Sequence, residues 1–311
     1  MATKSKQSVF TLIGVDIEGS WNVPLLENAA NLSSASLKFA HAELPPEQSA
    51  AGTACAPLEM ILDGQTHVIA CESGCRSTSL FDFPAPKQGN TALLVGNELS
   101  GLSPAILSRA DHVISIPMYG QGLSSINVAA ASAVALYGLD RDLARNSSAN
   151  AHSTSVAPDL LIVTPGDPSE LGSLLRSAWA FGWKKVYLLD EAGDWFSDNR
   201  ETVLASRSAA RREKNPLAVL RVDDLDLKQY DQIVVCDGQR HGTPLSRLQL
   251  GRRAGRMLVV YGGMPPDAAG HSCVEKVYVD FRDAKVVPCF RHAGSVLLSV
   301  LSRAVKRKKR G

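Results

Sequence analysis

The chain has 311 residues, 45% of them hydrophobic and 21% charged, which is ordinary for a soluble globular protein with room for two domains. Its net charge of +2 excludes a uniformly basic nucleic-acid-binding protein. No apolar run reaches the roughly 18 residues of a membrane span, and residues 1–10 are too polar for a secretory signal. We therefore expect no membrane partner and a cytoplasmic location, with the mitochondrial matrix or nucleus as alternatives.

The first half contains four short apolar runs that predict buried parallel strands. They are Phe10–Val15, His67–Cys71, Ala92–Val95 and His112–Ile116. A helix is expected over Leu102–Ala110, because Ser103 can cap it and Pro104 suits its first turn. A second helix, Ile126–Leu139, is apolar nearly all round, which is typical of a helix buried on most sides.

A small polar stretch, Asn146–Pro158, has no apolar period and predicts a linker. It separates a first domain, 1–145, from a second domain, 159–311. Strands are expected in the second domain at Leu160–Val163, Lys185–Leu189, Gln232–Cys236, Met257–Tyr261 and Lys276–Asp280. A helix starts at Asp167, with Glu170 at the spacing of a capping box, and a last helix covers Gly294–Val305. Strands that alternate with helices predict an α/β fold with a mainly parallel sheet.

Three segments of the first half recur in order in the second. Val68–Glu72 matches Ile233–Asp237, Thr78–Leu80 matches Thr243–Leu245, and Ala92–Gly96 matches Met257–Gly262. Matches in order at nearly constant offset favour two copies of one duplicated α/β domain.

The six cysteines do not predict a metal site. None forms a CxxC pair, and no His follows at zinc-finger spacing. Cys71 and Cys75 are two isolated ligands, a weak signal. We expect reduced thiols in a cytosol-like compartment and no bound metal.

The most specific stretch runs from Leu93 to Leu139. It contains, in order, Gly96-Asn97-Glu98, Gly101-Leu102-Ser103, Ile116-Pro117-Met118, Ser125-Ile126-Asn127-Val128 and Leu136-Tyr137. Loops after strand ends bind the ligands of open α/β sheets, and glycines let backbone amides approach a ligand closely. The ordered string resembles the signature motifs of the TrmH (SpoU) family in the SPOUT superfamily of RNA methyltransferases. Its departures are Leu99, where a Gly is usual, and Ile126, where a Leu is usual.

The resemblance implies two α/β-knot SPOUT domains in tandem, trefoil-knotted, with mainly parallel sheets, packed as an internal pseudo-dimer. It implies S-adenosylmethionine as cofactor, tRNA or rRNA as partner, and 2′-O-methylation of ribose as the reaction. The cofactor-binding residues it implies are Gly96, Asn97, Ile116, Pro117, Met118, Ser125 and Ile126. Glu98, Ser125 and Asn127 match family positions that line the reaction centre.

An earlier family motif carries an Arg that helps to position or activate the target 2′-hydroxyl. In the second half, Leu171–Ala178 resembles this motif, and Arg176 stands at the position of the motif's Arg. Glu170 stands where an Asn is usual, and a helix cap is an alternative role for it. In the first half Asn22 keeps the opening Asn, but Asn28 takes the place of the Arg.

The second half has the opposite defect, because its cofactor motifs are replaced. Gly262-Gly263-Met264, Val279-Asp280-Phe281 and Cys289-Phe290-Arg291 stand in their places. Active enzymes of the resembled family join the pocket of one subunit to the Arg of the other. We therefore expect one composite active site, with the pocket from the first half and Arg176 from the second. An Arg rarely loses its proton, so Arg176 is expected to clamp a phosphate.

Two other functions stay open at this point. Fusion and motif decay also fit a catalytically inactive RNA-binding or ribosome-assembly factor. Other SPOUT enzymes methylate bases, so the acceptor is open as well, and so is further homodimerisation.

Clusters of basic residues predict a polyphosphate partner. The predicted RNA-binding residues are Arg207, Arg211, Arg212, Arg252 and Arg253. The tail Lys306–Arg310 is also basic, although a solvated terminus explains it equally well.

Overall fold

The computed structural model describes residues 9–41, 55–120, 125–143, 158–211, 217–248, 255–265, 268 and 270–306. The predicted linker lies, except for Pro158, outside the described residues. So do three predicted RNA-binding residues and the end of the tail, namely Arg212, Arg252, Arg253 and Arg307–Arg310. Among the helices that are described, none combines the length and apolarity needed to cross a bilayer.

The chain forms two compact units that depart from the predicted domains 1–145 and 159–311. The first unit comprises Met1–Pro117, Asn127–Ser147 and Phe281–Pro288, and the second comprises Met118–Ile126, Ser148–Asp280 and Cys289–Gly311. The described residues of 118–126 thus belong to the second unit, and residues 281–288 belong to the first. We call these the two exchanged segments. The predicted domains were continuous stretches of sequence and so did not include these segments. Composition indicates where a linker lies, but it does not indicate on which sheet a loop packs.

The first unit is built on a parallel sheet. In its described part the strand order is β3-β2-β1-β6-β4-β7-β5. The strands are β1 (Val9–Val15), β2 (Ser36–His41), β3 (Cys55–Pro57), β4 (His67–Cys71), β5 (Thr78–Ser79), β6 (Asn90–Val95) and β7 (His112–Ser115). Every described pair of neighbours is parallel. The four apolar runs predicted as strands are confirmed as β1, β4, β6 and β7.

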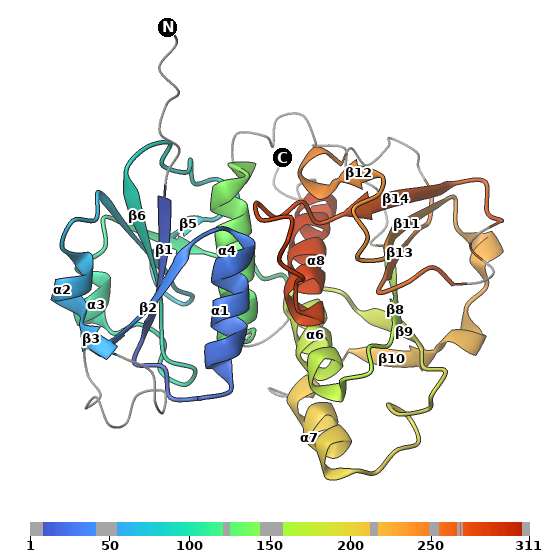
Figure 1. Ribbon diagram of the computed structural model, residues 1–311. Helices are drawn as coiled ribbons and strands as arrows, with labels where there is room; N and C mark the ends of the chain where they lie inside the picture. Colours follow the sequence, from blue (N-terminus) through green and yellow to red (C-terminus); the bar gives the residue numbers. More distant parts are fainter. Residues whose placement is uncertain are drawn as a thin grey trace, which may run out of the picture. The chain divides into compact units, whose positions relative to one another are not determined.

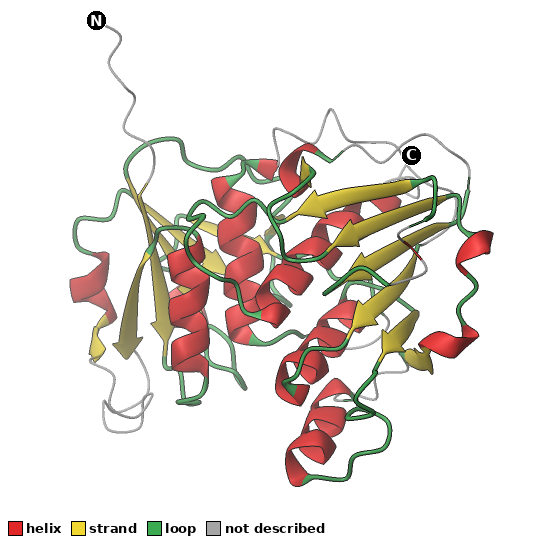
Figure 2. Ribbon diagram, turned by 45° about the vertical axis from the view of Figure 1, so that its right-hand side comes forward, coloured by secondary structure: helices red, strands yellow, loops and turns green. Residues whose placement is uncertain are grey.

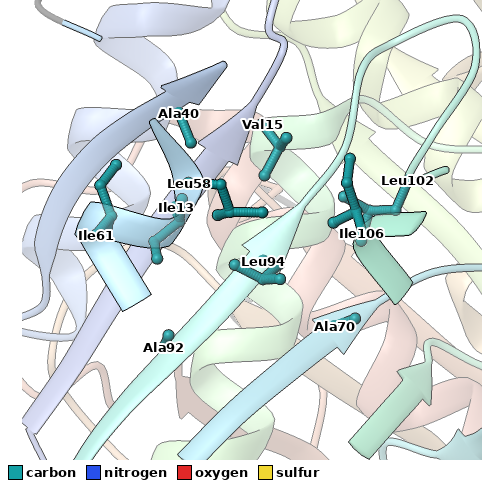
Figure 3. Packing of buried hydrophobic residues seen from close by; sticks show 10 residues of the cluster. All are labelled: Ile13, Val15, Ala40, Leu58, Ile61, Ala70, Ala92, Leu94, Leu102 and Ile106. Atoms are coloured by element: carbon teal, nitrogen blue, oxygen red, sulfur yellow. The ribbon is translucent and has the colours of Figure 1, made fainter. Parts of the chain in front are cut away.

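Helices cover both faces of this sheet (Figure 1). Helices α1 (Asn22–Leu32) and α4 (Val128–Asp140) pack side by side on one face, and α2 (Leu58–Leu62) and α3 (Pro104–Leu107) lie on the other. The buried cluster beneath α2 and α3 consists of Ile13, Val15, Ala40, Leu58, Ile61, Ala70, Ala92, Leu94, Leu102 and Ile106 (Figure 3). Burying each large aliphatic side chain stabilises the fold by about 1.5 to 3 kcal/mol.

Helix α4 is buried on most sides, as its composition predicted. Its small residues let neighbours approach closely: a Cβ added at Gly138 would lie 2.8 Å from a methyl carbon of Leu80. Helix α3 is shorter than predicted, although Ser103 caps it and Pro104 opens it as expected. Helix α3 ends at Leu107, and the chain enters β7 at His112.

The second unit repeats the same topology. The strand order of its described residues is β10-β9-β8-β13-β11-β14-β12, which is the first order with each strand number raised by seven. The strands are β8 (Asp159–Val163), β9 (Lys185–Leu189), β10 (Ala218–Arg221), β11 (Gln232–Cys236), β12 (Thr243–Pro244), β13 (Met257–Tyr261) and β14 (Val274–Tyr278). Their described pairings are all parallel. Two tandem α/β domains with parallel sheets are therefore confirmed, whereas the trefoil knot stays a prediction.

The helices of the second unit are α6 (Pro168–Ala180), α7 (Glu201–Ala210) and α8 (Phe290–Lys306). Helix α6 packs against both others, and Figure 2 shows helices beside the strands of each unit. The approach of α7 is very close, because a Cβ on Gly172 would lie 2.5 Å from the carbonyl oxygen of Ser206. The last helix begins four residues before the predicted Gly294. Short 3₁₀ turns, η3 (Val222–Asp224), η4 (Leu227–Gln229) and η5 (Leu245–Arg247), complete the unit.

Candidate functional site

A tight hairpin follows β6 in the first unit. Asn97 and Gly101 form an antiparallel bridge, and the N–H of Gly101 donates to the carbonyl of Asn97 at 3.0 Å. The side-chain oxygen of Asn97 accepts the N–H groups of Leu99 and Ser100 at 2.8 and 3.0 Å. A Cβ on Gly96 would lie 2.3 Å from the carbonyl carbon of Gly101, which itself has φ +70°. Both positions therefore require glycine.

The hairpin is tied to the loops that follow β1 and β4. The side-chain NH₂ of Asn97 donates to the carbonyl of Asp16 and to Oε1 of Glu18, both at 2.8 Å. Asp16 is buried and has the left-handed φ of 51°. The N–H of Leu102 donates to Oε2 of Glu72 at 2.7 Å. These contacts fix the loops at the carboxyl edge of the sheet, where open α/β folds bind ligands.

Three polar side chains meet at this edge, and we call Asn22, Glu98 and Asn127 the amide–carboxylate cluster. The side-chain oxygen of Asn127 caps α4 by accepting the N–H groups of Ala129 and Ala130 at 3.0 and 3.3 Å. Its NH₂ donates to Oδ1 of Asn22 at 2.9 Å. The NH₂ of Asn22 donates in turn to Oε1 of Glu98 at 2.5 Å. The helix cap thus sets the direction of a chain of hydrogen bonds that ends on the carboxylate.

Backbone groups complete the environment of the Glu98 carboxylate. The N–H of Gly19 donates to Oε1 at 3.1 Å, and the N–H of Glu18 donates to Oε2 at 3.2 Å. With Asn22, three donors converge on one carboxylate, and such charge-assisted bonds hold it firmly. A carboxylate has about four acceptor positions, so the donors among the described residues leave about one for a ligand.

A second group of site residues lies in the second unit, around Arg176 of α6. Its Nε donates to the carbonyl of Ser125 at 2.8 Å, and its terminal nitrogen donates to the Ser125 hydroxyl. The N–H groups of Tyr119 and Gly120 both donate to the carbonyl of Ala180, at 2.9 and 3.0 Å. Helix α6 therefore holds the exchanged segment 118–126 at both of its described ends.

The first unit holds the exchanged segment 281–288 in a matching way. Asn28, which takes the place of the Arg, donates from Nδ2 to the carbonyl of Val287 at 2.9 Å. Arg282 forms an ion pair with Asp140, whose side chain is 3% exposed. Asn28 and Arg176 thus occupy the same place in the repeat and bind the backbone of an exchanged segment.

The second unit has an ion pair where the first has its amide–carboxylate cluster. Nε of Arg291, the counterpart of Asn127, lies 2.5 Å from Oε1 of Glu170, the counterpart of Asn22. The backbone N–H of Arg291 donates to Oε2 of Glu170 at 2.8 Å, and its guanidinium donates to the Ser169 hydroxyl at 3.2 Å. The side chain of Asp167 caps α6, because its Oδ1 accepts the N–H of Ser169. Glu170 is therefore not the cap. Glu170 and Arg291 are 13% and 9% exposed and largely satisfy each other.

The thiols of Cys71, which is half-buried, and Cys236, which is buried, are poor nucleophiles. Burial, with a smaller contribution from the charge of Glu72, raises the pKa of Cys71 to about 12. Burial also raises the pKa of Cys236 to about 11. Both thiols are protonated at neutral pH, so neither supplies a thiolate for covalent chemistry. Within the described ranges, no group of three His, Cys, Asp or Glu side chains is placed to hold a metal ion.

Two of the predicted RNA-binding arginines can be placed. Arg207 lies in the last turn of α7 and donates from Nε to the carbonyl of Trp195 at 2.6 Å. Arg211 follows the helix and is exposed. The contact gives Arg207 a role in holding the loop after β9, and RNA binding by either residue stays a prediction.

The predicted site residues fall into two groups. Gly96, Asn97, Glu98, Ile116, Pro117 and Asn127 belong to the first unit, and Met118, Ser125, Ile126 and Arg176 belong to the second. The structure brings Glu98 and Asn127 together through Asn22, and it brings Arg176 to Ser125. Sequence reasoning did not assign Asn22 a role at the site, although its place at the start of the upstream motif was a usable signal. Glu72 carried no signal, because its role depends on the position of the hairpin.

Known proteins match the stretch that contains the hairpin and α4. Residues 52–137 match the model of the SpoU rRNA methylase family. A tRNA (guanosine(18)-2′-O)-methyltransferase of Aquifex aeolicus is 51% identical over 51 residues, covering 16% of this chain and 24% of that protein. The 23S rRNA (guanosine(2553)-2′-O)-methyltransferase RlmP of Bacillus subtilis is 43% identical over 54 residues, covering 17% and 21%. The chain thus matches about a quarter or less of the length of these relatives.

Among solved structures, the SpoU methyltransferase AviRb from Streptomyces viridochromogenes is similar over 45% of this chain and 62% of its own, with a TM-score of 0.37 and 21% identity. The family match over residues 52–137 includes the β6 hairpin, β7 and α4 as far as Tyr137, and with them Glu98 and Asn127. Through residues 52–137, the chain carries a domain of the SpoU (TrmH) family of the SPOUT superfamily.

Proposed function

We propose that this protein is an S-adenosylmethionine-dependent 2′-O-ribose methyltransferase that acts on tRNA or rRNA. The observation that carries the proposal is the amide–carboxylate cluster, in which Glu98 accepts hydrogen bonds from Asn22 and two backbone N–H groups. The names of the two curated relatives, both 2′-O-methyltransferases of RNA, agree with it. The shortness of the matches leaves the choice between tRNA and rRNA open.

The residues suited to hold the cofactor are those of the β6 hairpin and the loops after β7. Gly96 and Asn97 present a closely packed backbone whose shape is fixed by hydrogen bonds. Ile116 is buried, and Met118 and Ile126 are half-buried, so each offers apolar surface to an adenine ring. Pro117 and Ser125 complete the proposed set. Bound S-adenosylmethionine supplies an activated methyl group on a sulfonium, and the protein contributes mainly proximity and orientation.

The chain's own polar groups have distinct proposed roles. Glu98 keeps about one acceptor position, which suits the proton of the attacking 2′-hydroxyl. Asn22 and Asn127 keep the carboxylate in place, because their hydrogen bonds run in one direction from the α4 cap. A fixed acceptor lowers the reorganisation needed when the hydroxyl reacts.

We further propose that Arg176 completes this site and clamps a phosphate of the RNA. Its support is the contact with Ser125, a residue two positions before Asn127 in the chain. The first half has Asn28 at the corresponding position, so it lacks an arginine of its own there. A guanidinium presents several donors in one plane and matches phosphate oxygens bidentately.

The direct experiment maps 2′-O-methylated nucleotides in cells with and without the gene, and then repeats the transfer with purified protein. We expect at least one ribose methylation to disappear with the gene and to return on the purified RNA with labelled S-adenosylmethionine. Labelled methyl found on a base or on protein would instead contradict the ribose as acceptor. The same labelled product, digested to nucleosides, separates these outcomes.

A second function is favoured by two observations. Asn28 replaces the arginine of the first half, and the Glu170–Arg291 pair replaces the cluster of the second. Both changes fit an inactive RNA-binding or assembly factor that has lost catalysis. Calorimetric titration with S-adenosylmethionine followed by a transfer assay on total RNA distinguishes them: cofactor binding without any transfer supports the scaffold.

A further inference from the structure

An exposed indole ring lies beside the amide–carboxylate cluster. Trp21 is 70% exposed, whereas Trp183 and Trp195 are buried and Trp179 is half-buried. Trp21 directly precedes Asn22, and Leu99, which directly follows Glu98, is 74% exposed. Two large apolar side chains therefore face solvent next to two members of the same polar cluster.

The ring is held in place by the loop that also holds the Glu98 carboxylate. A Cβ on Gly19 would lie 2.8 Å from Cε2 and Cζ2 of Trp21 and 3.0 Å from Oε1 of Glu98. The indole and the carboxylate therefore share one glycine as their contact surface. Trp21 also has helical backbone angles at the start of α1, so its backbone is ordered with the helix. A supported but exposed ring is suited to stacking on a planar ligand.

The repeat provides an internal comparison. The position of Trp21 corresponds in the second unit to Ser169, one residue before Glu170. Ser169 accepts a hydrogen bond from the Arg291 guanidinium and so supports the ion pair. The unit that keeps the polar cluster has an exposed aromatic ring at this position, and the unit that lacks the cluster has a small side chain. Because both units share the fold, the fold does not explain the exposed ring, and we associate it with the polar cluster.

The surroundings of Trp21 favour a base over a phosphate. Asp16, Glu18 and Glu98 bring acidic side chains to the same loops, which repels an anionic backbone. An uncharged base has an apolar face for the indole. RNA-binding proteins commonly stack unpaired bases on aromatic side chains in this way.

We propose that Trp21 stacks on an unpaired base of the RNA substrate, and that this base lies next to the ribose that is methylated. The proposal rests on the proposed function, because it places a nucleotide at the amide–carboxylate cluster. Trp21 acts here as a substrate-positioning residue, and Asn22 and Glu98 keep their separate role at the reacting hydroxyl.

Quenching of tryptophan fluorescence by acrylamide tests the proposal with the full chain. Because Trp21 is the most exposed of the four tryptophans, its emission dominates the quenchable fraction. We expect a short single-stranded RNA of mixed sequence to protect this fraction, and Trp21→Ala to weaken binding of that RNA about 5- to 150-fold. Trp21→Phe keeps an aromatic face and should recover most of the affinity. S-adenosylmethionine alone should protect little, which separates an RNA base from the cofactor's adenine.

Val9→Ala is the matched control. Val9 is 56% exposed and starts β1, at the opposite end of the strand from the loop that contains Trp21.

Three results would each overturn the proposal. They are an RNA affinity of Trp21→Ala equal to wild type, no protection of the fluorescence by RNA, and equal protection by the cofactor alone. Failure of the proposed function is distinguishable, because methyl transfer would then be absent while RNA still protected Trp21.

Discussion

The first and second units share one topology but differ in the side chains at the same edge of the sheet. In the first unit, Asn22, Glu98 and Asn127 form a chain of hydrogen bonds that ends on a carboxylate with about one acceptor position to spare. In the second, Glu170 and Arg291 form a nearly buried ion pair that uses both charges internally. The two units therefore share a topology while their polar contacts at this edge differ, because the topology depends on the core and these contacts depend on loops.

The exchanged segments give a second comparison. Asn28 and Arg176 each bind the backbone of such a segment, so the position has a structural role in both units. Arg176 adds a positive charge and a contact with the Ser125 hydroxyl. Packing therefore accounts for a polar side chain at this position in both units, and the proposed phosphate clamp is a further reason for the arginine in the second.

The largest expected effect comes from removing the carboxylate that distinguishes the first unit. Glu98→Gln keeps the shape of the side chain but removes the charge on which three donors converge. We expect single-turnover methyl transfer to fall on the order of 10²- to 10⁴-fold. The matched control is Met264→Leu, at the counterpart position of the second unit, which should leave the rate within about twofold. Equal losses in both variants would remove the functional distinction between the units.

The next effect concerns the ion pair of the second unit. Arg291→Leu leaves the Glu170 carboxylate buried without its partner, so the free energy of unfolding should fall by about 3 to 5 kcal/mol. The double variant Glu170→Leu with Arg291→Leu should recover most of this loss, because no unpaired charge remains. Urea denaturation measures both variants. A double variant no more stable than the single one would contradict the account.

A smaller loss of stability is expected from a methyl group at the β6 hairpin. Gly96→Ala puts a Cβ 2.3 Å from the carbonyl carbon of Gly101, and backbone there must move. We expect a loss of about 3 kcal/mol and weaker cofactor binding, measured by thermal unfolding and calorimetry. Gly263→Ala, in the corresponding loop of the second unit, meets only Val163 carbons at 3.4–3.5 Å. That control should change stability by less than about 0.5 kcal/mol.

The smallest effect near neutral pH is a dependence of stability on pH, which grows as the pH falls. Burial, and then the charge of Arg291, lowers the pKa of His292 from 6.5 to about 3. Between about pH 6.5 and pH 3, His292 is protonated in the unfolded chain but stays neutral in the native protein. The free energy of unfolding should therefore fall as the pH drops below about 6.5, by up to about 1.4 kcal/mol per pH unit.

His292→Val tests this, because valine stands at the corresponding position of α4. The variant should lose that part of the pH dependence between about pH 6 and pH 4 in denaturation curves. An unchanged slope would show that His292 is protonated in the native protein.

Periodicity and composition predicted most of the fold. The apolar runs became buried strands, and the matching segments of the two halves revealed the duplication. The exchanged segments were not predictable, because residues 118–126 and 281–288 carry no composition signal for the sheet on which they pack. Edge strands such as β3 and β5 were also missed, since short, partly exposed strands lack a long apolar run.

The motif residues of the site were predictable, but their partners were not. Glu98 and Asn127 followed from an ordered string, whereas the link between them passes through Asn22, far away in the chain. Glu170 had two interpretations, a cap or a catalytic residue. The structure assigns it to a pair with Arg291, 121 residues away, and no local pattern could show that.

The central proposal is that one active site takes its carboxylate from the first unit and its arginine from the second. The most direct measurement is single-turnover methyl transfer by Arg176→Ala, with S-adenosylmethionine affinity measured on the same preparation. We predict that transfer at saturating cofactor falls on the order of 10²-fold or more, so that any weaker cofactor binding from the lost Ser125 contact does not account for the loss. Unchanged transfer by a variant that still binds the cofactor would contradict the proposal.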